Sequence, residues 1–265
     1  MDYIKKIPAI RWQNGEFEKV LEKTVKDENI FIYIDELQVR KFSTYPKDLE
    51  DFCIGYALGE GLIKGMDDVV SIQIKDNAIF LKTKYNHKVK TNISTTEGED
   101  NQGIIYESLM SDSAGGWRSE LKTIEPVFSD LKIKANDIIN NMAVLTDNAK
   151  IWKETGSVHV AQLIYGDEVI IREDVSRHVA VDKVIGAAAR KNYDLTHSYI
   201  CYSGRMPADM IIKFVRVKIP IVISNAAPAG SGYLIADEAN ITMVGFVRND
   251  RFNLYTAPDR VLLND

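Results

Sequence analysis

The last quarter of the chain alternates short apolar runs with segments of helical spacing, and this alternation constrains the fold more than any other feature. The apolar runs are Ser198–Tyr202, Ile219–Ser224 and Ile241–Val247, and the helical segments between them are Met206–Val217 and Gly232–Ala239. Strands that alternate with helices usually pair in parallel, and their crossover connections are right-handed. The pattern therefore predicts parallel strands with helices packed on them.

The region before these strands has the same mixed character. Gly166-Asp167 separates two runs, Val158–Ile164 and Glu168–Arg172, in a pattern typical of a β-hairpin. Helical spacing extends over Ala135–Lys150 and Ser176–Lys191. We expect these segments to join the parallel strands in one α/β (mixed α+β) domain.

The N-terminal part of the chain predicts a smaller α+β unit. Ile30–Asp35 is a short apolar run suited to a buried strand. Leu49–Ile63 places apolar residues at three- and four-residue spacings, as an amphipathic helix does. Val69–Ile74 and Ala78–Thr83 flank a turn signal, so they predict a hairpin.

Two polar stretches separate these two parts of the chain. Thr95–Gly103 is acidic and has no periodicity, and Ser111–Trp117 is rich in small and polar residues. Both are typical of exposed loops. We therefore place the boundary near residue 108, which gives an N-terminal α+β domain of residues 1–108 and a C-terminal domain of residues 109–265.

The charge and cysteine content exclude several classes of protein. The chain has 33 Lys and Arg residues against 38 Asp and Glu residues, a net charge of −5, whereas nucleic-acid coat proteins need a basic surplus. The two cysteines, Cys53 and Cys201, support neither a disulfide framework nor a zinc site of cysteine pairs. Because we find no apolar signal segment and no apolar run of membrane-spanning length, we expect a cytoplasmic protein with no membrane contact.

Polar or glycine-containing loops follow all three predicted parallel strands. They are Ser203-Gly204-Arg205, Ser224–Pro228 and Arg248–Arg251. Open parallel sheets bind ligands beyond the carboxyl ends of their strands, so these loops should meet on one edge. A glycine lets backbone N–H groups approach a ligand, and an arginine grips phosphate through two parallel hydrogen bonds.

These loops favour an anion such as a nucleotide phosphate, and Asp250 could accept hydrogen bonds from a guanine edge. The alternative is that the same residues are turn formers and partners in surface ion pairs.

A second cluster contains His159, Asp174, His178 and Asp182. Asp174 precedes a predicted helix, where a carboxylate can cap free N–H groups. His178 and Asp182 are four residues apart, so they share a helix face and could move protons near neutral pH. Two interpretations stay open: a nucleotide hydrolase that uses His159, His178 and Asp182, or a cap with an ordinary ion pair. The spacing is not diagnostic of a metal site, so we expect no metal.

Several ordered motifs resemble the FdhD family of formate dehydrogenase accessory proteins. The strongest is Arg172–Gly186 (REDVSRHVAVDKVIG), and Thr44–Ile63 fits more loosely. The resemblance covers nearly the whole chain, and its other motifs are Thr155–His159, Ser203–Arg205, Ser224–Pro228 and Gly245–Thr256.

This resemblance implies a cytidine-deaminase-like C-terminal domain beside the smaller α+β N-terminal domain. The sequence lacks the zinc signature of the base deaminases, so base deamination is not expected. The resemblance implies instead that the chain takes sulfur from a cysteine desulfurase and transfers it to the bis-molybdopterin guanine dinucleotide cofactor of formate dehydrogenase. GDP is the expected mimic of that ligand, and a homodimer is compatible with the resemblance.

The resemblance also implies which residues bind the cofactor. Six consecutive residues fall on the stretch assigned to cofactor binding: Phe246, Val247, Arg248, Asn249, Asp250 and Arg251. To these we add residues of the other strand ends and of the second cluster: Ser203, Gly204, Arg205, Ser224, His159 and His178. Formate dehydrogenase and a cysteine desulfurase are the implied partners, and nucleic acid is not.

The chain departs from the family at its sulfur-carrying loop. That loop has the form Ser-Cys-Gly-x-Cys-Gly, whereas the matching residues here, Ser113–Arg118, place Ala114 and Trp117 where the cysteines belong. A persulfide needs a thiolate, and we expect Cys53 and Cys201 to be buried in apolar segments. A non-catalytic binder, or chaperone, of the same cofactor is therefore the alternative to sulfur transfer.

Overall fold

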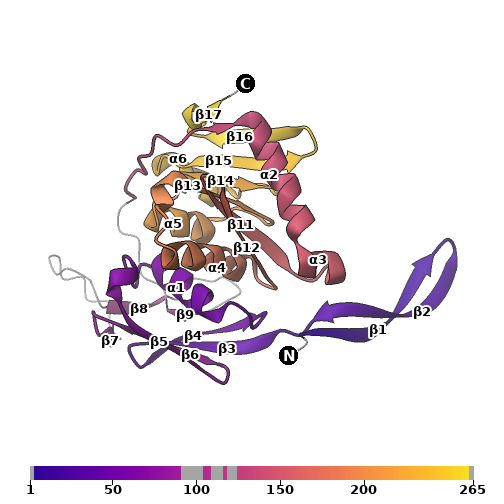
Figure 1. The fold of residues 1–265 in the computed structure, drawn as a ribbon, viewed down its shortest axis with the longest axis horizontal. Helices are drawn as coiled ribbons and strands as arrows, with labels where there is room; N and C mark the ends of the chain where they lie inside the picture. Colours follow the sequence, from indigo (N-terminus) through magenta and orange to yellow (C-terminus); the bar gives the residue numbers. More distant parts are fainter. Residues whose placement is uncertain (1–2, 91–103, 109–115, 118–123, 263–265) are drawn as a thin grey trace.

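The structure of the chain is a computed structural model that describes residues 3–90, 104–108, 116–117 and 124–262. Its described part is a mixed α/β architecture with six α-helices and two larger sheets. Figure 1 shows the layers in order, from the N-terminal sheet through helices α1 and α4 to the C-terminal sheet.

The N-terminal sheet has four strands in the order β4-β3-β6-β5. The strands are β3 Glu28–Ile34, β4 Leu37–Thr44, β5 Val69–Lys75 and β6 Ala78–Thr83. Helix α1 (Leu49–Gly59) packs on this sheet, where the rings of Phe52 and Tyr56 meet Phe42 edge to face. The predicted strand, helix and β5–β6 hairpin are confirmed.

The C-terminal sheet has six strands in the order β12-β11-β13-β14-β15-β16. The strands are β11 His159–Tyr165, β12 Glu168–Asp174, β13 Ser198–Tyr202, β14 Ile221–Ser224, β15 Thr242–Arg248 and β16 Arg251–Thr256. The predicted β11–β12 hairpin and the parallel pairing of β13, β14 and β15 are confirmed. Strand β16, which the sequence analysis did not predict, pairs antiparallel with β15.

Helices cover both faces of this sheet. Successive residues of a strand point to opposite sides, so the apolar strands place side chains on both faces that must be buried. The helices are α2 Ala135–Asn148, α3 Lys150–Thr155, α4 Arg177–Arg190, α5 Ala208–Arg216 and α6 Gly230–Glu238. Ile200 of β13 packs in the core shared with α1, α4 and α5, whereas the next residue, Cys201, packs in the core beneath α2.

Two glycines set how closely α1 and α4 cross. A Cβ atom on Gly55 would lie 1.7 Å from the backbone oxygen of Asp182, and one on Gly186 would lie 1.8 Å from that of Asp51. The two backbones therefore touch, and one apolar core runs from the N-terminal sheet to the C-terminal sheet. The predicted boundary near residue 108 adjoins residues outside the described ranges, and the division into two domains stays a prediction.

The remaining elements are small, apart from one long ribbon that the sequence analysis did not predict. This ribbon, the arm, consists of β1 Ile4–Gln13 and β2 Glu16–Val25. The short strands are β7 Lys88–Lys90, β8 Ile104–Ser108, β9 Gly116–Trp117, β10 Ile133–Lys134 and β17 Val261–Leu262, with single 3₁₀ turns at Met66–Asp68, Leu195–His197 and Pro258–Arg260. None of the helices in the described ranges has the length and apolar character that crossing a bilayer requires.

Candidate functional site

The carboxyl ends of the three parallel strands lie side by side and form one rim. The hydroxyl of Ser224, at the end of β14, donates a 2.6 Å hydrogen bond to the backbone oxygen of Gly204, which follows β13. The backbone N–H of Phe246, on β15, donates to the oxygen of Ala226 at 3.1 Å. The gathering of these strand ends, which the parallel pairing predicts, is therefore present.

Position 204 in this rim requires glycine. Its φ of +145° lies in a region that L side chains rarely adopt. An added Cβ would also lie 3.0 Å from Cδ of Arg177. The glycine therefore brings the guanidinium-bearing side chain of Arg177 against the end of β13.

A cavity of about 580 Å³ opens at this rim, and we call it the rim cavity. Its cationic groups are Arg177, from the first turn of α4, and Arg205, from the loop after β13. The other lining residues are Trp152, Gly156, Ser157, Val158, His159, Val175, Ser203, Gly204, Asn225 and Ala226. Two guanidinium groups beside backbone and amide donors suit an anion.

His159 is held in one tautomer at the edge of the rim cavity. Its Nδ1 atom lies 2.7 Å from the backbone oxygen of Ser203. A carbonyl oxygen can only accept a hydrogen bond, so Nδ1 carries the proton. The Nε2 atom of this tautomer is then a hydrogen-bond acceptor at the edge of the rim cavity.

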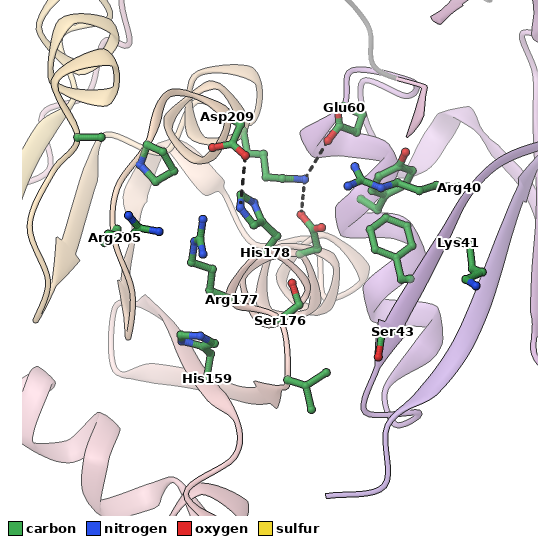
Figure 2. Close-up of a pocket in the computed structure, with 17 residues that line it drawn as sticks. Arg40, Lys41, Ser43, Glu60, His159, Ser176, Arg177, His178, Arg205 and Asp209 are labelled. Atoms are coloured by element: carbon green, nitrogen blue, oxygen red, sulfur yellow. Dashed lines mark hydrogen bonds and ion pairs between the residues drawn. The ribbon is translucent and has the colours of Figure 1, made fainter. Parts of the chain in front are cut away.

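A second cavity, of about 620 Å³, lies between the N-terminal and C-terminal layers, and we call it the inter-layer cavity. It shares His159, Val175, Arg177 and Arg205 with the rim cavity, so the two cavities adjoin. Figure 2 shows Arg177 between His159 and His178, with Arg205 beside Arg177 on the side away from His178. The sequence analysis missed the residues that β4 and α1 contribute: Arg40, Lys41, Phe42, Ser43, Tyr56 and Glu60.

A buried charged cluster forms part of the wall of the inter-layer cavity. Nζ of Lys213 lies 2.9 Å from Oδ1 of Asp182 and 3.2 Å from Oε1 of Glu60. Burial raises the pKa of Asp182 to about 6, although Lys213 opposes this shift. Burial lowers the pKa of Lys213, but the two carboxylates outweigh this effect and raise it. The cluster ties α1, α4 and α5 together.

The second predicted cluster is arranged differently from the expectation. His178 and Asp182 both lie on α4, but each has its own partner on α5. Nε2 of His178 lies 3.4 Å from Oδ2 of Asp209, and Asp182 pairs with Lys213. Helical spacing gives a shared face, whereas neighbouring elements decide the partner. Asp174 accepts from the backbone N–H of Ser176 at 2.9 Å, which agrees with the capping interpretation.

The predicted stretch Phe246–Arg251 only partly reaches the rim. Phe246 is half-buried beside Ala226, and Val247 is buried in the core beneath α2. The turn that follows, Arg248-Asn249-Asp250-Arg251, is exposed at the β15–β16 hairpin, and its residues are not among those that line either cavity. Strand β15 continues into this hairpin, so the arginines there stand apart from both cavities, and their part in cofactor binding stays a prediction.

Comparisons with known proteins identify the family of the chain. A model of the FdhD/NarQ family matches residues 25–262. This chain belongs to the FdhD/NarQ family. The sulfur carrier protein FdhD of Methanothermobacter thermautotrophicus is 43% identical over 264 residues, which are 99% of this chain and 100% of the relative. Protein FdhD of Methanocaldococcus jannaschii is 30% identical over 256 residues, 96% of this chain and 97% of the relative.

A solved FdhD structure supports the fold. The crystal structure of a candidate formate dehydrogenase accessory protein from Desulfotalea psychrophila matches with a TM-score of 0.77 and 21% identity. The match covers 98% of this chain and 100% of that protein. At this identity the likeness supports the mixed α/β fold only.

The two thiols of this FdhD-family chain are inaccessible. Cys53 in α1 and Cys201 in β13 are both fully buried, as predicted. Burial raises the pKa of Cys201 to about 12 and raises the pKa of Cys53 well above its usual range. Neither thiol is therefore a ready nucleophile in the folded chain.

The loop that matches the family's sulfur-carrying loop lies mostly outside the described residues, and Ala114 is among those outside. The backbone of Trp117 belongs to β9, which pairs with β8 and lies beside β4. Strand β4 in turn borders the inter-layer cavity. Within the described ranges, His, Cys, Asp and Glu side chains form no group of three that could hold a metal ion.

Proposed function

We propose that this chain is a formate dehydrogenase accessory protein that binds the bis-molybdopterin guanine dinucleotide cofactor at the rim cavity, without carrying sulfur on a thiol of its own. The observation that carries the proposal is the convergence of Arg177 and Arg205 on a cavity at the carboxyl ends of parallel strands. Ligands of open α/β sheets bind at this edge.

The donors of the rim cavity suit the diphosphate of such a dinucleotide. Arg177 and Arg205 each offer a planar set of N–H donors, and Asn225 adds an amide. The cofactor is the cargo of the protein in this proposal, and these residues bind and orient its anionic part.

The hydrolase hypothesis has less support from the geometry. It requires His159, His178 and Asp182 to act together on one nucleotide. In the structure His178 pairs with Asp209, and Asp182 is tied to Lys213 in the wall of the inter-layer cavity. These pairs give both residues a structural role.

Calorimetry with GDP tests the binding proposal. We expect Arg205→Ala to weaken GDP binding by about 10- to 150-fold, because a hydrogen bond to a charged group contributes about 1.5–3 kcal/mol. Arg11→Ala is the matched control, since Arg11 is an exposed arginine on the arm that lines neither cavity, and it should leave the affinity unchanged. GDP that does not bind, or that binds both variants equally, contradicts the proposal.

Arg248, Asp250 and Arg251 keep an outer role in the proposal, as contacts to the part of the dinucleotide that extends beyond the cavity. Because they are exposed and lie outside both cavity linings, their substitution should weaken GDP binding less than Arg205→Ala does. An Arg251→Ala variant in the same titration gives this comparison.

Sulfur transfer from a cysteine desulfurase is the second candidate function. It is favoured by the 43% identity with a protein named as a sulfur carrier. Because both thiols here are buried, we expect the intact mass to show no added sulfur after incubation with a desulfurase and cysteine. Sulfur retained on Cys53 or Cys201 in that measurement would establish the second candidate instead.

The proposal extends to the finer features that the family resemblance implies. The mixed sheet with parallel β13, β14 and β15 and helices on both faces supports a cytidine-deaminase-like C-terminal domain. Formate dehydrogenase, a cysteine desulfurase and a second copy of the chain are the proposed partners, and the cytoplasm is the proposed location.

A further inference from the structure

Trp152 is an exposed aromatic side chain of the rim cavity to which the proposed function gives no role. It lies on α3 and lines the rim cavity but not the inter-layer cavity. The side chain is 41% exposed, although tryptophan side chains are highly buried on average. Within the described ranges, no aromatic pair and no cation–π contact includes its ring. The indole is therefore available to a ligand of the cavity.

The backbone of α3 fixes the position of Trp152. The backbone N–H of Trp152 donates to Oε1 of Glu173 on β12 at 2.8 Å, and that of Ile151 donates to Oε2 at 3.0 Å. One carboxylate therefore ties the start of the helix to the edge of the C-terminal sheet. Gly156 ends the helix with a φ of +64°, and its N–H donates to the backbone oxygen of Trp152 at 2.7 Å. The chain then enters β11, so the helix and the start of this strand line the same cavity.

The rim cavity combines two kinds of lining that suit different parts of one ligand. Arg177 and Arg205 suit phosphate groups, whereas a flat aromatic ring suits the face of a nucleobase. The volume of about 580 Å³ lies in the usual range of sites that bind small molecules and cofactors. A nucleoside diphosphate satisfies both kinds of lining. A diphosphate without a base would leave the indole of Trp152 in contact with water.

We propose that the indole of Trp152 stacks on the base of a nucleoside diphosphate whose phosphates bind Arg177 and Arg205. This inference rests on the proposed function and deepens it, because it assigns the base to the α3 side of the rim cavity. It also makes the site selective for nucleotides over other diphosphates. Every base has a π-face, so stacking adds affinity without distinguishing one purine from another. A purine covers more of an indole than a pyrimidine does, so GDP should bind more tightly than UDP.

Calorimetric titration of the full chain with GDP and with inorganic pyrophosphate tests this assignment. Trp152→Ala should weaken GDP binding by about 5- to 150-fold, the usual effect of removing one stacked aromatic side chain, and should leave pyrophosphate binding unchanged. Arg205→Ala should weaken the binding of both ligands, because it removes a phosphate contact. Phe128→Ala is the matched control, since Phe128 is an exposed aromatic residue that lines neither cavity, and it should change neither affinity.

Fluorescence gives a readout that a purely structural role of Trp152 would not change. The chain has three tryptophans, so the double variant Trp12→Phe/Trp117→Phe keeps Trp152 as its single tryptophan. Saturating GDP should quench the emission of this variant, because the base lies against the indole, whereas saturating pyrophosphate should not. Trp152→Phe should keep most of the affinity for GDP, because a phenyl ring also stacks on a base. The circular dichroism spectrum of each variant should match that of the wild type.

The two ligands separate a failure of this assignment from a failure of the proposed function. Trp152→Ala that binds GDP as the wild type does, or that weakens GDP and pyrophosphate binding equally, would overturn the stacking role while diphosphate binding at the rim cavity stands. Emission of Trp152 that does not change at saturating GDP would also overturn it. A wild-type chain that binds neither GDP nor pyrophosphate would overturn the stacking role and the proposed function together.

Discussion

Replacing Lys183 by methionine should destabilise the chain by about 3–5 kcal/mol, the usual cost of removing one partner of a buried ion pair. Nζ of Lys183 lies 2.7 Å from Oδ2 of Asp174, and both side chains are fully buried. Lys183 also donates to the backbone oxygen of Tyr45 at 2.9 Å. Methionine fills a similar volume but leaves the Asp174 carboxylate without its counter-charge.

Urea denaturation followed by circular dichroism measures this loss. Lys191→Met, just past the end of the same helix, is the matched control, because Lys191 is exposed and its loss should change the stability by less than about 0.5 kcal/mol. A Lys183→Met variant as stable as Lys191→Met would show that hydrogen bonds from Thr44, Tyr45 and Ser176 suffice to hold the Asp174 carboxylate.

Gly186→Ala should cost about 3 kcal/mol or more, because the added methyl group meets backbone rather than a movable side chain. Its Cβ would lie 1.8 Å from the backbone oxygen of Asp51 and 2.7 Å from the backbone nitrogen of Gly55. Overpacking a core usually costs about 1–3 kcal/mol, and a backbone that cannot yield costs more. Helices α1 and α4 would have to separate, which would also displace Glu60 and Asp182 from Lys213.

The control is Gly230→Ala, since an added Cβ at Gly230 meets nothing within 4 Å. This residue begins α6, where alanine is the better helix former, so the variant should be as stable as the wild type or slightly more stable. Thermal unfolding compares the two variants. Equal melting temperatures would mean that the α1–α4 crossing relaxes without strain.

Local periodicity accounts for the parts of the fold that the sequence predicted. Helix α4 and strands β13, β14 and β15 have long apolar patterns, and the pairing of parallel strands follows from their alternation with helices. Strand β16 alternates Phe252 and Leu254 with polar residues, which is a strand signal, but the motif there was interpreted as a ligand loop.

The arm and the inter-layer cavity could not be predicted in this way. The arm exists only in the register that pairs Trp12 with Phe17, and no spacing within one strand specifies a register. Arg40 and Lys213 meet the same cavity from elements far apart in the sequence. Arg40 lies on β4 and Lys213 on α5, and the long-range packing of α1 against both elements brings them to the cavity. Spacing within the sequence carries no signal for such packing.

The most direct test of whether the strand ends bind a nucleoside diphosphate is hydrogen exchange of the backbone amides. The exchange is measured with and without saturating GDP. The rim consists of the loops after β13 and β14, and Arg205 and Asn225 line its cavity. We expect slower exchange with GDP at Ser203–Met206 and Asn225–Ala229, and a smaller effect at Arg248–Arg251. GDP bound with unchanged exchange at both rim loops would contradict this expectation.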